Sequence, residues 1–154
     1  MLNPHYITGF VDGEGCFSVS FNRRAKMKTN IEVRPSFSVS QKKSSLEILK
    51  KIHNFFKCGG IRYSKNDATY KYEVRSIKDL VKIIIPHFEK YPLFTAKADD
   101  FEKFVLICRK ISANLHLNSP ELRKIIDLAY LMNESGKRRY SKKDLLRLIG
   151  KMKI

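Results

Sequence analysis

Alternating apolar and polar residues occur in two pairs of short segments, and a stretch with helical character precedes each pair. The first pair is residues 16–22 and 31–40, and the second is residues 60–64 and 69–75. A two-residue period is typical of strands with one buried face, and pairs joined by short turns favour antiparallel hairpins. We therefore expect the order αββαββα followed by two or three further helices, which is an α+β class with an antiparallel sheet.

The chain length of 154 residues is enough for one domain with a substantial core. We expect a single domain over residues 1–154, with its core at about 3–110 and C-terminal helices at about 119–150.

Local signals place several element ends. Pro35 lies inside an alternating segment, which predicts an edge strand or a bulge there. Ser44 and Glu47 have capping-box spacing and predict the start of a helix. A later helix is expected over 77–85, ending at Pro86.

The net charge of +16 and the pI of about 9.9 indicate a polyanionic partner. Nucleic acid is the leading candidate and an anionic membrane surface is the second. The apolar run 81–85 is too short to span a bilayer, and the N-terminus lacks a signal-peptide pattern.

Cysteine and histidine usage excludes several classes of site. Cys16, Cys58 and Cys108 are odd in number and form no CxxC pair, so we expect no disulfide partner and a reducing, intracellular compartment. The four histidines are scattered, which disfavours a zinc finger or a histidine-based nuclease motif.

One face of the predicted sheet is rich in arginine, lysine, asparagine and serine, which suit hydrogen bonding to base edges in the major groove. Residues 16–43 hold seven basic residues and one acid, Glu32, and the pattern shows nothing that pairs off those charges. The alternative is an ordinary solvated sheet face. The candidate DNA-binding residues are Ser18, Ser20, Asn22, Arg24, Arg34, Ser36, Ser38, Arg62, Ser64, Lys71, Glu73 and Arg75.

The opening helix, expected from Pro4 to Gly13, carries glycines on one face. Gly9 and Gly13 are four residues apart, and each costs about 1 kcal/mol relative to alanine. Close approach of a second helix would offset that cost, and the natural partner is the same helix of a second chain. We expect Tyr6, Gly9, Phe10 and Gly13 at this dimer interface; the alternative is a frayed helix end.

An acid, Glu14, follows at the C-terminal end of this helix, where the helix dipole disfavours a carboxylate. Beside a basic sheet, such an acid invites a hard divalent cation. Two-fold symmetry would bring two copies of Glu14 together over a duplex, which suggests metal-assisted phosphodiester hydrolysis.

The segment ITGFVDGEG, residues 7–15, resembles the LAGLIDADG motif of the homing endonucleases at all nine positions. The segments FSVSQKKSSLEILKKI, GGIRYS, YKYEVRS, IKDLVKIIIPHF and YPLFTAKADDF resemble later parts of that family in the same order, so the likeness covers roughly residues 3–110. It implies an αββαββα fold with motif helices at the centre and saddle-shaped sheets in the major groove. Asp12, at the sixth motif position, would be structural.

The same resemblance implies a catalytic set. Glu14, at the eighth motif position, would bind the metal together with Gly13, and Gln41 would order the water near it. A basic residue would assist the leaving group; Lys97 is our choice, with Thr95 as the alternative position.

A chain with one motif is expected to act as a homodimer on a long, near-palindromic double-stranded DNA target. The expected cofactor is Mg²⁺ or Mn²⁺, with Ca²⁺ supporting binding without cleavage. Alternatives are an intron maturase, a non-catalytic DNA- or RNA-binding protein, or one half of a two-motif protein. Richness in Lys, Ile and Asn suggests an organellar gene (mitochondrion or chloroplast), and an archaeal source also fits.

Overall fold

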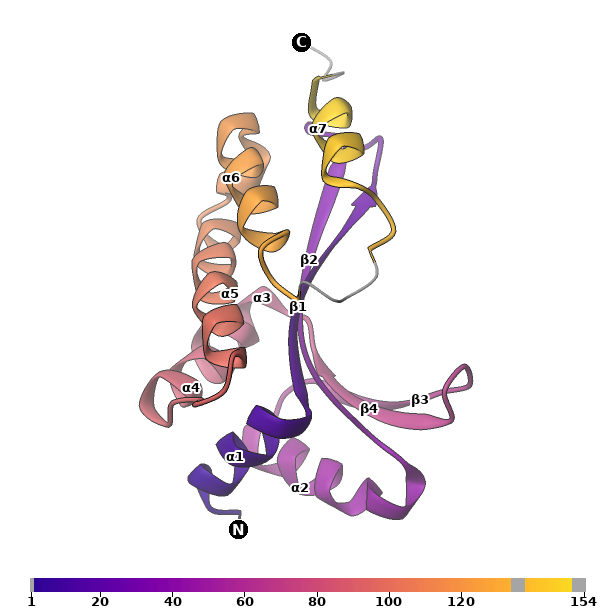
Figure 1. Ribbon diagram of the computed structural model, residues 1–154, viewed down its shortest axis with the longest axis vertical. Coiled ribbons are helices and arrows are strands. Elements are labelled where there is room, and N and C mark those ends of the chain that lie inside the picture. The colour runs from indigo at the N-terminus through magenta and orange to yellow at the C-terminus, as the bar shows by residue number, and fades with distance from the viewer. Residues whose placement is uncertain (1, 134–137, 151–154) are drawn as a thin grey trace. The chain divides into compact units, whose positions relative to one another are not determined.

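The computed structural model describes residues 2–133 and 138–150. Helices and strands alternate as expected, and one four-stranded sheet has the order β1-β2-β4-β3, with β4 antiparallel to both β2 and β3. The α+β class is therefore confirmed (Figure 1). The elements are α1 (Pro4–Glu14), β1 (Gly15–Arg23), β2 (Ile31–Gln41), α2 (Leu46–Phe56), β3 (Gly60–Ser64), β4 (Thr69–Val74), α3 (Ile77–Asp79), α4 (Ile85–Lys90), α5 (Lys97–Ser112), α6 (Ser119–Ala129) and α7 (Lys142–Gly150).

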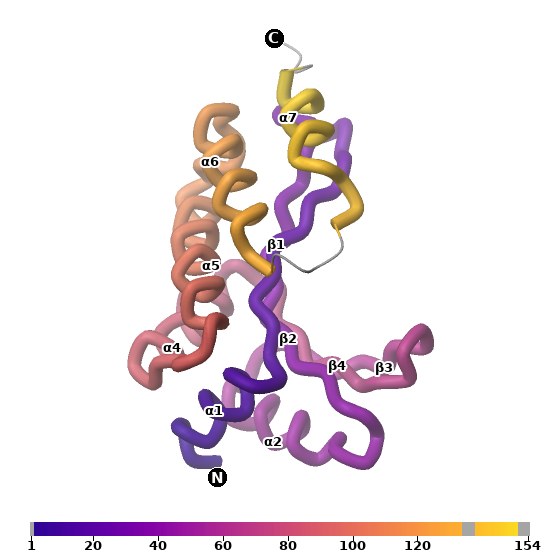
Figure 2. The backbone as a smooth tube through the Cα atoms, in the orientation of Figure 1, coloured from indigo at the N-terminus to yellow at the C-terminus, as the bar shows by residue number. Residues whose placement is uncertain are grey.

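The chain divides into two compact units, and the tube in Figure 2 shows the path through both. The first unit comprises residues 1–17 and 36–98 and contains α1, α2, α4 and the β3–β4 hairpin. Its core is aromatic: the ring of Phe37 lies 5.3 Å from that of Phe17 and 5.6 Å from that of Phe88. Packing of α2 against β3 and β4 completes this core.

The second unit comprises residues 18–35 and 99–154 and contains most of α5, then α6, α7 and the outer part of the β1–β2 hairpin. Buried aliphatic side chains of α5 and α6 form its core, and α6 also contacts α7. The Asn30 amide donates to the Leu148 carbonyl at 3.4 Å, so α7 lies against the hairpin tip (Figure 1).

The strand register explains why β2 tolerates a proline at position 35. β2 is an inner strand, yet its pairing with β4 covers Phe37 to Gln41. Pro35 lies outside that ladder, so its missing N–H breaks no hydrogen bond to β4.

Two predicted helix boundaries are wrong, one at the start of a helix and one at the end of another. A 3₁₀ turn over Lys43–Ser45 precedes α2, so Ser45 is the N-cap in place of Ser44, and its side chain makes no capping bond. The helix over 77–85 continues past Pro86, because a π-helical turn at Leu80–Ile84 widens the backbone just before the proline. This wider turn accommodates a residue that has no N–H and would otherwise crowd the preceding carbonyls.

The spacing of Ser76 with Asp79 and of Ser141 with Asp144 predicts two capped helix starts. Both are confirmed, because Ser76 accepts from the N–H of Asp79 and Ser141 from that of Asp144.

Ser119-Pro120-Glu121 and Gly136 predict the start and the end of a further helix. That helix, α6, stops at Ala129, and Gly136 itself lies outside the described residues. None of the helices formed by the described residues is long and apolar enough to cross a membrane.

Candidate active site at the end of the first helix

The C-terminal end of α1 turns directly into β1. Asn3 caps the start of the helix, accepting from the His5 N–H at 2.8 Å, and Pro4 occupies the first turn. At the other end Gly15 is required sterically, because a Cβ there would lie 2.6 Å from Val11 Cγ1 and 2.9 Å from the Val11 carbonyl oxygen. This close passage fixes the direction in which the neighbouring acid, Glu14, leaves the helix.

Asp12 ties the end of α1 to the loop before α5. Its carboxylate accepts from the N–H groups of Phe94, at 2.8 Å, and Thr95, at 3.1 Å, and from the Thr95 hydroxyl at 2.5 Å. Burial pulls the pKa of Asp12 upward, but the hydrogen bonds from Thr95 and Phe94 outweigh it and hold the pKa below its usual value. Asp12 therefore stays ionised and structural.

Lys97 places a positive charge at the same helix end. Its Nζ donates to the carbonyl oxygens of Val11, at 2.9 Å, and Asp12, at 3.0 Å. A cation is favourable at a helix C-terminus, where carbonyl groups lack partners within the helix. The hydroxyl of Thr95, by contrast, is directed to Asp12. Of the two candidate positions, Lys97 carries the charge and Thr95 supports the loop.

Glu14 and Gln41 come together from elements 27 residues apart in the chain. Gln41, the last residue of β2, directs its Nε2 to a Glu14 carboxylate oxygen at 3.4 Å. Glu14 is exposed, as is the neighbouring Gly13. The structure thus brings Glu14, Gln41 and Lys97 to one end of α1.

The donor set at this helix end suits a hard cation. Glu14 offers one exposed carboxylate and Gly13 an adjacent backbone carbonyl, which are the oxygen ligands that Mg²⁺ takes alongside phosphate and water. Within residues 2–133 and 138–150, no group of three or more His, Cys, Asp or Glu side chains could hold a metal ion. The residues therefore fit an ion that completes its coordination with other molecules.

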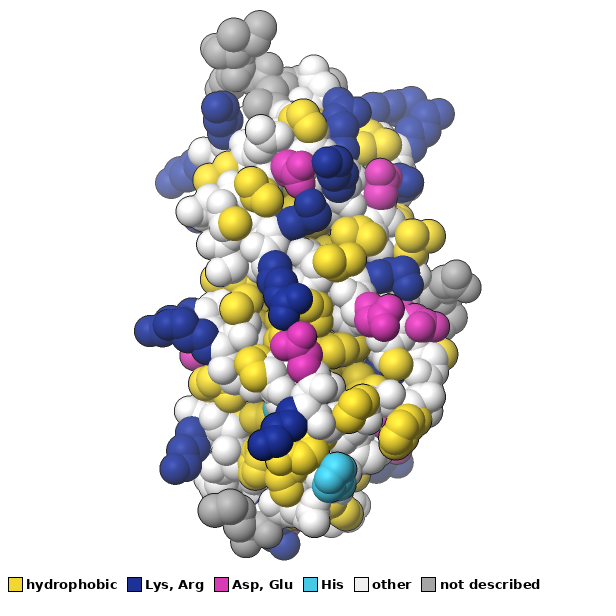
Figure 3. All heavy atoms as spheres, turned by 90° about the vertical axis from the view of Figure 1, so that its left-hand side faces the viewer, with side chains coloured by type: hydrophobic (Ala, Val, Ile, Leu, Met, Phe, Trp, Pro, Cys, Tyr) yellow, Lys and Arg dark blue, Asp and Glu magenta, His cyan; other side chains and the backbone are white. Residues whose placement is uncertain are grey.

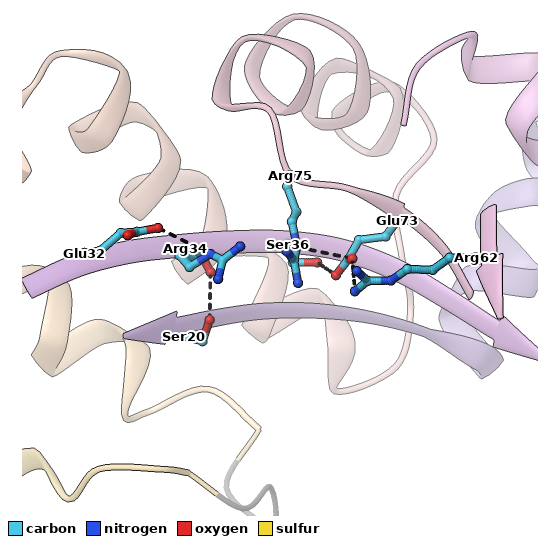
Figure 4. A network of polar contacts seen from close by, with 7 residues as sticks. All are labelled: Ser20, Glu32, Arg34, Ser36, Arg62, Glu73 and Arg75. Atoms are coloured by element: carbon cyan, nitrogen blue, oxygen red, sulfur yellow. Dashed lines mark hydrogen bonds and ion pairs between the residues drawn. The ribbon is translucent and has the colours of Figure 1, made fainter. Parts of the chain in front are cut away.

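The outer face of the β3–β4 hairpin carries a charged cluster, shown in Figure 4. Glu73 forms ion pairs with Arg62, at 2.6 Å, and Arg75, at 3.2 Å. The Ser36 hydroxyl donates to its second oxygen at 2.6 Å. Ser36 and Ser38 are only 8% exposed, so Ser36 supports Glu73 more than it faces solvent.

The outer part of the β1–β2 hairpin has its own cluster, also drawn in part in Figure 4. Glu32 pairs with Arg24, at 2.8 Å, and with Arg34, at 3.4 Å, and Ser20 donates to the Arg34 carbonyl at 3.4 Å. The expectation that nothing pairs off the charges of this segment is therefore wrong, because Glu32 serves two arginines. The remaining candidate DNA-binding side chains all reach solvent at least in part: Ser18, Asn22, Ser64 and Lys71.

One face of α1 is open. Tyr6, Gly9, Phe10 and Gly13 share it, with the Tyr6 and Phe10 rings stacked at 6.3 Å, and a Cβ on either glycine would meet nothing within 4 Å. Phe94, which the sequence did not single out, is 91% exposed although its N–H is held by Asp12. Its only sequence signal is an aromatic residue in the short loop before Thr95.

Basic side chains are not confined to one element. On the face shown in Figure 3, lysine and arginine side chains are spread widely among apolar ones. Net charge alone therefore does not locate a site, and the geometry around α1 and the sheet does.

Comparison with solved structures defines the class. The fold is that of the homing endonucleases: the structure of I-TnaI matches with a TM-score of 0.85 and 36% identity over 99% of both chains. The structure of I-SmaMI bound to an uncleaved DNA target in the presence of calcium ions matches with a TM-score of 0.87 and 33% identity, over 99% of this chain and 50% of that one.

Sequence comparison gives the family. Residues 7–108 match the family model described as LAGLIDADG endonuclease. The chain belongs to the LAGLIDADG endonuclease family. A Neurospora crassa protein named "Probable intron-encoded endonuclease 2" is 38% identical over 82% of this chain, which spans only 28% of that relative's length.

Proposed function

We propose that the chain is a site-specific homing endonuclease that makes a metal-dependent double-strand cut in DNA. The observation that carries this proposal is the exposed Glu14 carboxylate at the end of α1, with Gln41 at 3.4 Å and the Lys97 ammonium on the same helix end. Family membership and the DNA-bound structure of I-SmaMI support the substrate class.

Each residue of the site has a distinct role in this proposal. Glu14 and the carbonyl of Gly13 would hold Mg²⁺ or Mn²⁺, and such an ion supplies a more acidic water and a stabilised leaving oxygen. Gln41 steadies the Glu14 carboxylate and offers its remaining amide hydrogen to a water. Lys97 stabilises negative charge that develops on the scissile phosphate. Ca²⁺ is expected to support binding without cleavage.

The polar sheet face would lie in the major groove of a long, near-palindromic site. Its exposed arginines can contact guanine with paired N–H groups, and the serine and asparagine side chains adapt to other base edges. The proposed dimer requires a second α1 against the open face of the first, with Gly9 and Gly13 allowing close approach. The full-length match to I-TnaI supports a one-motif protein, and the half-length match to I-SmaMI keeps one half of a longer protein as the alternative.

The name of one relative supports a proposal about the cellular context. The Neurospora crassa relative is named as intron-encoded, and we propose that this gene also lies in an intron, with the protein acting inside an organelle under reducing conditions.

A cleavage selection tests the proposal. The protein is incubated with partly randomised, near-palindromic duplexes in Mg²⁺ or in Ca²⁺, and the cut ends are sequenced. We expect one long, two-fold-symmetric site cut in Mg²⁺ alone. Specific binding with no cutting in either metal would favour a maturase or a DNA-binding module.

The Glu14→Gln variant tests whether Glu14 is the metal-binding acid. It should lose cleavage by at least about 10²-fold and retain target binding, because one ligand oxygen and its charge are removed. Glu47→Gln is the matched control: Glu47 is exposed on α2 and pairs with Lys50. Equal cleavage by Glu14→Gln and the wild type would defeat the assignment.

A further inference from the structure

Glu73 is a largely buried acid that lies between two exposed arginines of the sheet. Its side chain is 11% exposed, whereas those of its partners Arg62 and Arg75 are 57% and 45% exposed. One carboxylate oxygen accepts from Arg62 and pairs with Arg75, and the other accepts from Ser36. Both oxygens are therefore occupied within the protein.

Burial raises the pKa of Glu73, but the hydrogen bond from Ser36 and the charges of Arg75 and Arg62 outweigh it and lower the pKa below its usual value. The carboxylate is thus a fixed negative charge at neutral pH. Gly60 lies directly across from Glu73 on β3, two residues before Arg62.

The arginines retain unused donors. A guanidinium has five N–H donors in a planar fork, and the contact with Glu73 uses Nη2 of Arg62 and Nε of Arg75. A guanidinium held on one side loses less rotamer freedom when its other side binds, which is the usual benefit of preorganisation.

We propose that Glu73 is a positioning residue for sequence reading: it holds Arg62 and Arg75 so that their outward N–H groups meet the acceptor edges of guanine, and it does not contact DNA itself. This inference rests on the proposed function only in requiring that this sheet face meets DNA. It replaces the expectation that Glu73 itself binds DNA, since its side chain is only 11% exposed and three of its roughly four acceptor positions are taken by Arg62, Arg75 and Ser36.

A carboxylate in this place lowers affinity for phosphates in general and favours discrimination between bases. Within the other unit, Glu32 also pairs with two arginines, Arg24 and Arg34.

The test is a double-mutant cycle read one base at a time. Binding of the wild type, Glu73→Gln, Arg62→Ala and the double variant is measured in Ca²⁺ against the selected target and each of its single-base variants. We expect Glu73→Gln to reduce discrimination about 5- to 10-fold at guanine positions that Arg62→Ala also affects, and to leave affinity for unrelated duplex equal or higher.

In the Arg62→Ala background, Glu73→Gln should add little at those positions, because the group it positions is gone. Full additivity, or lost discrimination at a base that Arg62→Ala and a parallel Arg75→Ala variant both leave unchanged, would show that Glu73 reads DNA directly and would overturn the inference. An unchanged base profile in Glu73→Gln would also overturn it.

Two further variants separate positioning from charge and folding. Glu47→Gln changes the net charge equally but lies on α2, and it should leave the base profile unchanged. Ser36→Ala removes one support of Glu73 and no charge, and it should give a smaller loss at the same positions even if Glu73→Gln folds poorly. Wild-type protein that binds no duplex specifically would defeat the proposed function instead.

Discussion

At the scale of single residues, Thr95 and Lys97 make different contacts at the end of α1. The sequence alone left open which of these two positions supplies the group that assists catalysis. The Lys97 ammonium lies on the carbonyls of Val11 and Asp12, while the Thr95 hydroxyl serves the Asp12 carboxylate. A charge is needed near a reacting phosphate, whereas a hydroxyl bound to a carboxylate is structural.

We therefore expect Lys97→Met to reduce the single-turnover cleavage rate by about 10²- to 10³-fold with little change in target affinity. Thr95→Val, the matched variant two residues earlier, should lower the free energy of unfolding by about 1–3 kcal/mol and reduce cleavage less. Rapid-quench kinetics and urea unfolding on both proteins provide the comparison. The reverse order of cleavage defects would assign the role to Thr95.

At the scale of elements, α1 is joined to α4 through a polar contact inside an aromatic cluster. The Thr8 hydroxyl donates to the Tyr91 carbonyl at 2.9 Å and lies 3.2 Å from His87 Nε2. The His87 ring packs edge-on against Phe56 and Phe88 and is 8% exposed. Burial, with a contribution from the charge of His5, lowers the pKa of His87 to about 4.

The contribution of buried His87 to the stability of the protein should decrease in acid. Below pH 6.5 the unfolded chain binds a proton that native His87 does not, so the free energy of unfolding falls as the pH drops from 6.5 toward 4. The expected loss from this group between pH 7.5 and pH 5 is about 2 kcal/mol. Urea unfolding of His87→Phe should lack that part of the pH dependence, while a His53→Gln control on α2 keeps it. Parallel pH profiles for the wild type and His87→Phe would contradict this account.

The elements also show how far sequence reasoning reaches. The alternation of Ile31, Val33, Phe37 and Val39 correctly predicts four buried side chains of β2, because that pattern is local. It does not predict that Ser36 and Ser38, on the other side of the strand, are buried as well. The contacts of Asp12 with Thr95 and of Glu73 with Ser36 join residues 83 and 37 positions apart, and no local period encodes them. The pairing of Glu14 with Gln41 was expected only through resemblance to a family.

At the scale of the whole molecule, the question is how one chain with one motif could act on both strands of a duplex. One exposed carboxylate at the end of α1, Glu14, and a net charge of +16 agree with the proposed homodimer, in which each chain would supply one such group. The open face of α1 carries the exposed ring of Tyr6, and the exposed ring of Phe94 belongs to a residue whose N–H bonds to Asp12 on the same helix. Association through α1 would bring a second Glu14 close to the first.

Substitution of Gly13 by leucine tests this arrangement, because stability and association should change in opposite directions. A Cβ at Gly13 meets nothing within 4 Å in one chain, and leucine favours helix over glycine by about 1 kcal/mol, so the single chain should be as stable or slightly more stable. The larger side chain would hold two α1 helices apart, so sedimentation velocity should show the dimer replaced by monomer. Gly60→Leu is the control, since that glycine is equally open but lies on β3. A Gly13→Leu protein that stays dimeric would place the association surface elsewhere than on α1.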